Sequence, residues 1–195
     1  MKHLRLVDGV RDGAARAARQ IVLFLIFICS GCLVSGEKGR MPVFDVSSDA
    51  FPEDGQIPVA YTCDGTNISP PLTWGPVPQG TAGIAILVTD PDAPGGTFIH
   101  WVVYNIPQGT RGVPAGGTGK DVLPAGSVQG VNDFGRQAYG GPCPPKGKPH
   151  HYHFAVYALD STISPAGKRD GRMIEKAFAG HILAKGETVG VYRRA

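Results

Sequence analysis

The chain of 195 residues is long enough for one domain of ordinary size with an appendage. Its formal net charge of +3 is concentrated in residues 1–31, which carry five basic and two acidic side chains, so the rest of the chain, with fourteen of each, has a net charge of zero. Basic side chains form no cluster in that remaining part, and a nucleic-acid partner is therefore not expected.

Residues 1–31 are predicted to be a secretory signal peptide. Five basic residues precede an uninterrupted apolar run over residues 21–28, and small residues follow it. The run is too short for a transmembrane helix, which needs about 20 apolar residues. An N-terminal membrane anchor or a buried helix is the alternative interpretation.

Cys32 is the candidate lipidation site, because Ser30-Gly31-Cys32 resembles a bacterial lipobox, in which the cysteine is acylated and becomes the mature N-terminus. Residues 32–40 would then form a lipidated N-terminus and a short polar tether. This predicts a protein anchored by lipid in the cell envelope and facing the periplasm, with the membrane as its partner through Cys32. A soluble periplasmic or secreted protein, or a cytosolic version starting at Met41, are the alternatives.

Residues 41–195 are predicted to form one domain, without a second boundary or a repeat. Gly and Pro, 28 and 17 of the 195 residues, interrupt helices and favour short strands joined by turns. Strands are predicted over residues 43–46, 83–89, 98–106, 151–159 and 188–192, and the second of these is apolar throughout, as in a strand covered on both faces. One good helix is predicted late in the chain, on the spacing of Met173, Ile174, Ala177 and Phe178, with Gly180 as its C-cap. The fold class is therefore mostly β and β-sandwich-like, with one or two C-terminal helices.

A proline-containing turn, Asp-Pro-Asp-Ala-Pro at residues 90–94, directly follows the buried strand. Its prolines fix φ and cannot donate to a strand ladder, so the strand must end there. Asp90 is either a turn-capping group or a site residue held rigidly at the end of the strand. Asp92 is equally explained by hydrogen bonds to nearby backbone amides.

His100 stands near the start of the strand predicted over residues 98–106. Strand alternation places His100 with Val102 and Tyr104 on one face, and Ile99 with Trp101 and Val103 on the other. Taken alone, His100 is better explained as a structural histidine with a hydrogen-bond partner than as a site residue.

A second Gly/Pro-rich loop, residues 139–149, leads into His150. Prolines limit its freedom before binding, and glycines allow a close backbone approach to a ligand. Alternation places His150 with Tyr152 on one face of the next strand, and His151 with His153 on the other. The latter pair has the spacing of metal ligands on a strand, but no third ligand stands at a fixed spacing, and no metal site is predicted.

Cys63 and Cys143 both lie in Gly/Pro-rich loops. In an oxidising compartment, a disulfide between them would close a long loop and add a few kcal/mol of stability. Two free thiols are the alternative, because spacing does not determine whether the geometry permits a bridge.

Four motifs follow one another along the chain: Asp-Pro-Asp-Ala-Pro at 90–94, His-Trp-Val-Val-x-Asn-Ile-Pro at 100–107, Tyr-Gly-Gly-Pro-x-Pro-Pro-Lys-Gly at 139–147 and His-x-Tyr-x-Phe at 150–154. In this order and spacing they resemble the phosphatidylethanolamine-binding protein family, and most closely its bacterial branch of Raf kinase inhibitor-like proteins. The similarity covers residues 44–192, nearly all of the chain after the predicted signal peptide.

The resemblance implies a single domain with a large antiparallel sheet, a smaller sheet, C-terminal helices, and an anion pocket formed by two proline-containing loops. The residues that match this pocket are Asp90, His100 and His150 as its polar groups, Gly141, Pro144 and Pro145 as its lining loop, and Tyr152 at its edge. Two imidazoles beside a carboxylate can hold a phosphate by hydrogen bonds. We therefore expect an exported binding protein for a phosphate-bearing small molecule or a phospholipid headgroup, without a cofactor.

Two other classes of function are kept open. A regulator or inhibitor of an envelope enzyme would use protein–protein contact at the loop surface around Pro144 and Pro145, with an unknown protein target. A weak hydrolase would use Asp90 and His100 to activate water, although the sequence shows no nucleophile and no pair of oxyanion donors.

Overall fold

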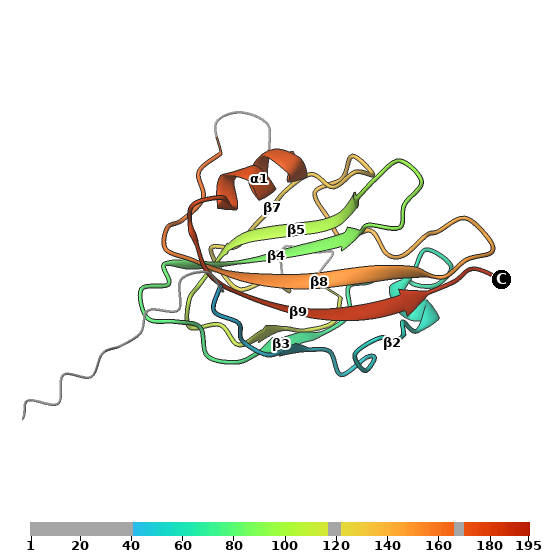
Figure 1. Cartoon of the computed structure of the whole chain (residues 1–195), viewed down its shortest axis with the longest axis horizontal. Helices are drawn as coiled ribbons and strands as arrows, with labels where there is room; N and C mark the ends of the chain where they lie inside the picture. Colours follow the sequence, from blue (N-terminus) through green and yellow to red (C-terminus); the bar gives the residue numbers. More distant parts are fainter. Residues whose placement is uncertain (1–40, 117–121, 166–169) are drawn as a thin grey trace, which may run out of the picture. The chain divides into compact units, whose positions relative to one another are not determined.

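The computed structural model describes residues 41–116, 122–165 and 170–195, which form two β-sheets. The larger sheet has the strand order β2-β9-β8-β4-β5-β7 (Figure 1). The smaller sheet has the order β1-β3-β6. In chain order the elements are β1 (Val46–Ser47), β2 (Gly55–Gln56), the 3-10 helix η1 (Val59–Tyr61), β3 (Leu72–Trp74), β4 (Gly83–Asp90), β5 (Phe98–Ile106), β6 (Gly112–Val113), β7 (Val128–Gln129), β8 (His150–Leu159), α1 (Gly171–Phe178) and β9 (Ile182–Tyr192).

The predicted signal peptide, Cys32 and the tether lie outside the described residues. Across the described ranges, no helix is long and apolar enough to cross a membrane.

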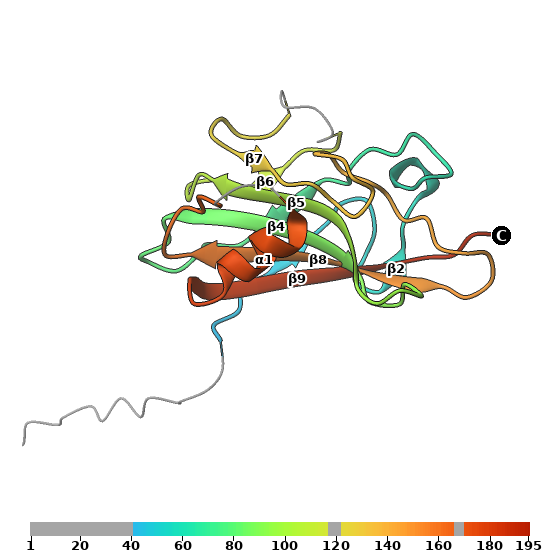
Figure 2. The same ribbon diagram turned by 90° about the horizontal axis from the view of Figure 1, so that it is seen from above.

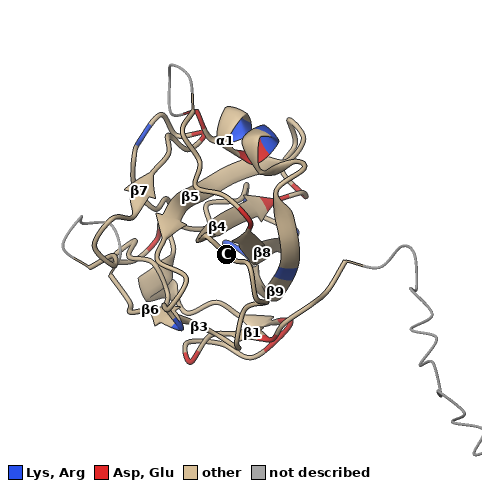
Figure 3. Ribbon diagram, turned by 90° about the vertical axis from the view of Figure 1, so that its left-hand side faces the viewer, with Lys and Arg blue, Asp and Glu red and all other residues tan. Residues whose placement is uncertain are grey.

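The main core lies between the two sheets, which face each other in the end-on view of Figure 3. Alternate residues of β4, beginning with Ile84 and Ile86, point into it together with Trp101 of β5 and Phe154 of β8. The smaller sheet supplies Leu72 among others from the opposite side. The expectation of a mostly β, two-sheet domain is confirmed.

A second core lies on the other face of the larger sheet, under helix α1 (Figure 2). Ala85 and Leu87 of β4 point to this side, and Ile174 and Phe178 of α1, four residues apart, pack onto it. The apolar run of β4 is thus covered on both faces, as its sequence predicts. The helix begins after Asp170, whose carboxylate accepts a hydrogen bond from the Arg172 amide, as an N-cap does.

Two predicted strands differ from the structure. The segment predicted as a strand over residues 43–46 instead crosses between sheets: Val43 makes an isolated bridge to Lys185, and the chain then enters the smaller sheet as β1. The closing strand β9 starts at Ile182 rather than near residue 188, because it pairs with β8 along the length of that strand. Pairing in the larger sheet is antiparallel except between β2 and β9.

Candidate functional site

Three strand ends meet at one end of the larger sheet and bring the predicted polar residues together. Strands β8 and β5 flank β4 and run antiparallel to it, so the end of β4 lies beside the beginnings of the other two. Asp90 ends β4, His100 is near the start of β5 and His150 begins β8. This end lies at the right of Figure 1, on the same side as the C-terminus.

Asp90 serves as a turn cap and as the partner of a buried histidine. Its Oδ1 accepts a hydrogen bond from the Asp92 amide at 2.8 Å, and its Oδ2 lies 2.7 Å from His150 Nδ1. Asp90 and His150 are only 3% and 8% exposed. The two interpretations of Asp90 left open by the sequence are therefore compatible: the turn fixes the carboxylate, and the fixed carboxylate orients the imidazole.

His100 is placed by a β-bulge. Successive residues of β4 pair with Ile99 and Trp101 of β5, so His100 is an extra residue between them. The bulge turns its side chain toward Tyr152, against whose ring it packs edge-on with centroids 5.2 Å apart. The prediction that His100 shares a face with Val102 is wrong for this reason, since Val102 packs into the core under α1.

The His100 ring is enclosed and has a fixed orientation. Its Nδ1 lies 2.7 Å from the Gly140 carbonyl oxygen, and the rings of Phe98 and Phe134 lie 5.0 and 5.4 Å from it, centroid to centroid. Burial lowers the pKa of His100, and the Gly140 carbonyl and the charge of Asp90 oppose this only in part. Because a carbonyl oxygen can only accept, the neutral ring carries its proton on Nδ1 and leaves Nε2 without one.

A cavity of about 200 Å³ opens between these residues and the two proline-containing loops. Five of the predicted residues line it: Asp90, His100, Pro144, Pro145 and His150. Five other residues of the lining were not predicted, namely Ala93, Pro94, Phe98, Phe134 and Cys143. Ala93 and Pro94 belong to a motif already quoted, whereas Phe134 stands in a polar segment with no pattern to mark it.

Gly141 and Tyr152, both predicted at the pocket, lie behind its lining. The Gly141 amide donates to Asn67 Oδ1 at 2.7 Å, and a Cβ atom on Gly141 would lie 2.4 Å from the Tyr61 carbonyl oxygen. Packing between two backbone segments thus accounts for the glycine. Tyr152 is buried against the histidine rings, and its burial, followed by the charge of Asp90, raises its pKa, so its hydroxyl stays protonated.

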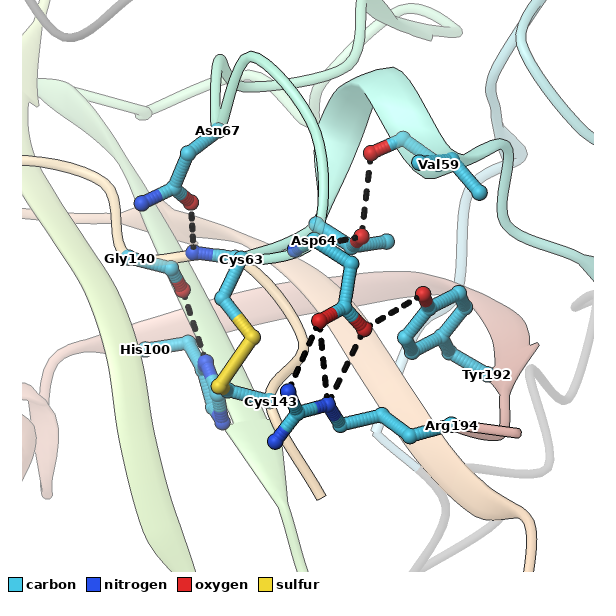
Figure 4. The surroundings of a disulfide bond; sticks show 11 residues. Val59, Cys63, Asp64, Asn67, His100, Gly140, Cys143, Tyr192 and Arg194 are labelled. Atoms are coloured by element: carbon cyan, nitrogen blue, oxygen red, sulfur yellow. Dashed lines mark hydrogen bonds and ion pairs between the residues drawn. A yellow bond between two sulfur atoms is a disulfide. The ribbon is translucent and has the colours of Figure 1, made fainter. Parts of the chain in front are cut away.

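The pocket loop is joined to the segment after η1 by a disulfide between Cys63 and Cys143 (Figure 4). Hydrogen bonds reinforce the junction: the Cys63 amide donates to the Pro142 carbonyl at 3.0 Å, and the Tyr139 hydroxyl donates to the Tyr61 carbonyl at 2.9 Å. Nearby, Asp64 forms an ion pair with Arg194 close to the C-terminus. The loop before β8 is therefore held to η1 and the segment after it by a disulfide and by hydrogen bonds.

His151 and His153 point away from the cavity and have separate carboxylate partners. His151 Nδ1 lies 2.8 Å from Asp92 Oδ2, and His153 Nδ1 lies 3.0 Å from Glu187 Oε1. Within the described part of the chain, no group of three metal-ligating side chains is found. Asp92 also accepts a hydrogen bond from the His151 amide, which is 59 residues away in the sequence, so its carboxylate binds β8 and not a nearby amide of its own turn.

The two-sheet fold and the polar end of its larger sheet place this chain in a known family. The profile of the phosphatidylethanolamine-binding protein family matches residues 47–193, and the chain belongs to that family. The crystal structure of Escherichia coli YbcL, described as a new member of the mammalian PEBP family, has a TM-score of 0.73 at 40% identity, over 78% of this chain and 99% of that one.

Relatives come from bacteria and archaea. A UPF0098 protein of Pyrococcus abyssi is 42% identical over 182 residues, which are 90% of this chain and 99% of that protein. LppC of Mycobacterium tuberculosis, provisionally named as a lipoprotein, is 38% identical over 148 residues, which are 75% of this chain and 71% of that one. A name of this kind associates one relative with the cell envelope.

Proposed function

We propose that the protein binds a phosphate-bearing small molecule or a phospholipid headgroup in the cavity. In this proposal His100 and His150 donate hydrogen bonds to the anion, and Asp90 holds His150 in place. The observation that carries it is the pair of buried imidazoles whose Nδ1 atoms each lie 2.7 Å from an oxygen acceptor.

The hydrogen bonds of the two rings favour an anionic ligand. Both Nδ1–H groups are used, toward the Gly140 carbonyl and the Asp90 carboxylate, so only Nε2 of each ring is left for a ligand. Nε2 donates only when the ring is protonated, and an adjacent anion favours the protonated ring. A phosphate group, with several acceptor oxygens, matches two such donors.

The size and charge of the cavity restrict the ligand further. A volume of about 200 Å³ is smaller than that of most drug-binding pockets, so the cavity suits a headgroup and not an acyl chain. Among the described residues that line it are one carboxylate and two imidazoles, and none of these lining residues is Lys or Arg. The net positive charge therefore depends on histidine protonation, and affinity should be modest at neutral pH.

Calorimetric titration with O-phosphoethanolamine and with glycerophosphoethanolamine, between about pH 5 and 8, tests the proposal. Ethanolamine, which lacks the phosphate, serves as the ligand control. We expect His150→Ala to weaken binding by about tenfold or more, because it removes a charged hydrogen bond. His151→Ala is the matched control, since this neighbouring histidine lies outside the cavity lining. No binding at any pH, or equal binding by His150→Ala, would contradict the proposal.

We further propose that Cys32 is acylated and holds the domain at the cell envelope. The lipobox-like sequence and the lipoprotein name of LppC support this. Expressed in a bacterium supplied with labelled palmitate, the full chain should incorporate the label and fractionate with membranes, and Cys32→Ser should not be labelled. Equal labelling of the two proteins, or none of the wild type, would rule out an acyl anchor at this residue.

A further inference from the structure

Asn132 uses the whole hydrogen-bonding capacity of its side chain on the backbone around the pocket. The residue is 3% exposed. Its Nδ2 donates to the carbonyl oxygens of His100 and Ala138 at 3.0 and 2.8 Å, and its Oδ1 accepts from the amides of Phe134 and Arg136 at 3.1 and 3.0 Å. A side-chain amide has two donor hydrogens and two acceptor positions, and all four are occupied.

The hydrogen bonds donated by Asn132 Nδ2 fix the backbone from which the His100 ring projects. The His100 carbonyl belongs to the β-bulge, and it accepts from the Gly140 amide at 3.0 Å as well as from Asn132. The Gly140 carbonyl in turn accepts the His100 Nδ1–H (Figure 4). Asn132 and Gly140 thus hold the bulge, and Gly140 also sets the rotation of the ring.

The hydrogen bonds accepted by Asn132 Oδ1 shape the turn that carries Phe134. This aromatic ring lines the cavity, lies 5.4 Å from the His100 ring between centroids, and is 40% exposed. The backbone of Asn132 closes the same turn, because its amide donates to the Arg136 carbonyl and its carbonyl accepts from the Gly135 amide, both at 2.9 Å. The side-chain oxygen of Asn132 adds two bonds to this turn, which presents the Phe134 ring to His100.

The next residue, Asp133, holds the other side of the bulge. Its Oδ2 accepts from the Ile99 amide at 2.8 Å and from the Arg172 guanidinium at 2.8 Å, and its own amide donates to the Ile99 carbonyl. Two consecutive residues of one loop therefore bind two consecutive residues of β5. Hydrogen bonds from this loop therefore position the bulge, in addition to the pairing between β4 and β5.

We propose that Asn132 is a positioning residue that sets the orientation of His100 and Phe134 and thereby the affinity of the cavity for its ligand. Asn132 does not itself line the cavity. The inference rests on the proposed function, because it assigns the means by which the proposed site keeps its geometry.

A matched pair of substitutions tests this. Asn132→Ser keeps a side-chain oxygen able to accept from the turn amides, but its shorter side chain has a single hydroxyl hydrogen and cannot donate to both the His100 and the Ala138 carbonyls. Asn105→Ser makes the same change at the far end of β5, where Asn105 donates to and accepts from the backbone of Ile163 at 2.9 and 2.8 Å. Neither substitution alters charge, and Asn105 is remote from the cavity lining.

Two measurements are compared in both variants: affinity for glycerophosphoethanolamine, and the pH titration of the His100 ring followed by NMR in the ligand-free protein. The titratable groups around this ring are Asp90, Asp133 and Tyr152, with His150 in the lining of the same cavity. In Asn132→Ser we expect affinity to fall about tenfold, as for a ligand losing one well-placed hydrogen bond. We also expect the His100 midpoint to move up toward the ordinary histidine value, because the ring gains water.

Asn105→Ser should leave both measurements unchanged while lowering the melting temperature. If the wild type binds no phosphate ester, the proposed function fails, and the titration of His100 still decides the role of Asn132. The inference is overturned if folded Asn132→Ser titrates and binds as the wild type does, or if Asn105→Ser shows the same changes. Should Asn132→Ser fail to unfold cooperatively at any temperature, Asn132→Gln, which keeps an uncharged amide but moves it by one methylene, is titrated in its place.

Discussion

Removing the disulfide should destabilise the protein strongly and leave its pocket formed. Cys63 and Cys143 are 80 residues apart in the sequence. In the chain-entropy account, opening a loop of this length stabilises the unfolded state by about 4.5 kcal/mol at 25 °C. Measured losses of unfolding free energy on removing native disulfides are about 2–5 kcal/mol. We therefore expect Cys63→Ser/Cys143→Ser to lose about 3–4 kcal/mol of unfolding free energy, which is a large part of the stability of an ordinary domain.

Ligand affinity should change much less, because hydrogen bonds join the same two loops. The Gly141 amide bonds to Asn67, and the Tyr139 hydroxyl bonds to the Tyr61 carbonyl, whether or not the sulfurs are joined. Urea unfolding gives the free energy, and calorimetry with glycerophosphoethanolamine gives the affinity. A loss below about 1 kcal/mol would refute the loop-entropy reasoning. An affinity more than about tenfold weaker in the folded variant would refute the reasoning on the hydrogen bonds.

Three further predictions follow from single contacts. Affinity for glycerophosphoethanolamine should rise as the pH falls from about 8 to about 5, because burial lowers the pKa of His100 in the free protein and a bound anion raises it. Calorimetry in two buffers of different ionisation enthalpy should show that binding takes up protons, and the absence of proton uptake would contradict this. Gly141→Ala should cost about 1–3 kcal/mol in urea unfolding, because its Cβ would lie 2.4 Å from a backbone carbonyl oxygen, whereas Gly95→Ala, with nothing within 4 Å, should cost less than about 0.5 kcal/mol. A hydrogen bond from Arg194 is the largest cause that lowers the pKa of Asp64. The stability from this carboxylate is therefore present above its unfolded pKa and is lost as the pH falls through the lower folded value. Arg194→Ala should reduce the melting temperature near pH 7 and not near about pH 2, and equal reductions at both would be contrary evidence.

The sequence by itself determined the layering of the fold and the two loops that form the site. The apolar run over residues 83–89 predicts a strand covered on both faces, and the structure covers it with the smaller sheet and with α1. Prolines at the end of that strand force a turn, so Asp90 had to stand at a strand end. Both inferences use only the residues of one segment, because they follow from local backbone restriction and from the burial that an apolar segment requires.

Only the tertiary structure decided how the site is assembled. The bulge at His100 is defined by pairing with β4, so a count of alternate residues along β5 placed the side chain on the wrong face. Phe134 lines the pocket and Asn132 binds the backbone behind it, through contacts with His100 and Phe98 of β5 that are 32 or more residues away in the sequence, and no local pattern marks either residue. Gly141 matched a pocket motif, yet its environment is the backbone of the loop after η1. Side-chain patterns report what a segment can bury, whereas the register between strands and the contacts between distant loops depend on the whole chain being folded.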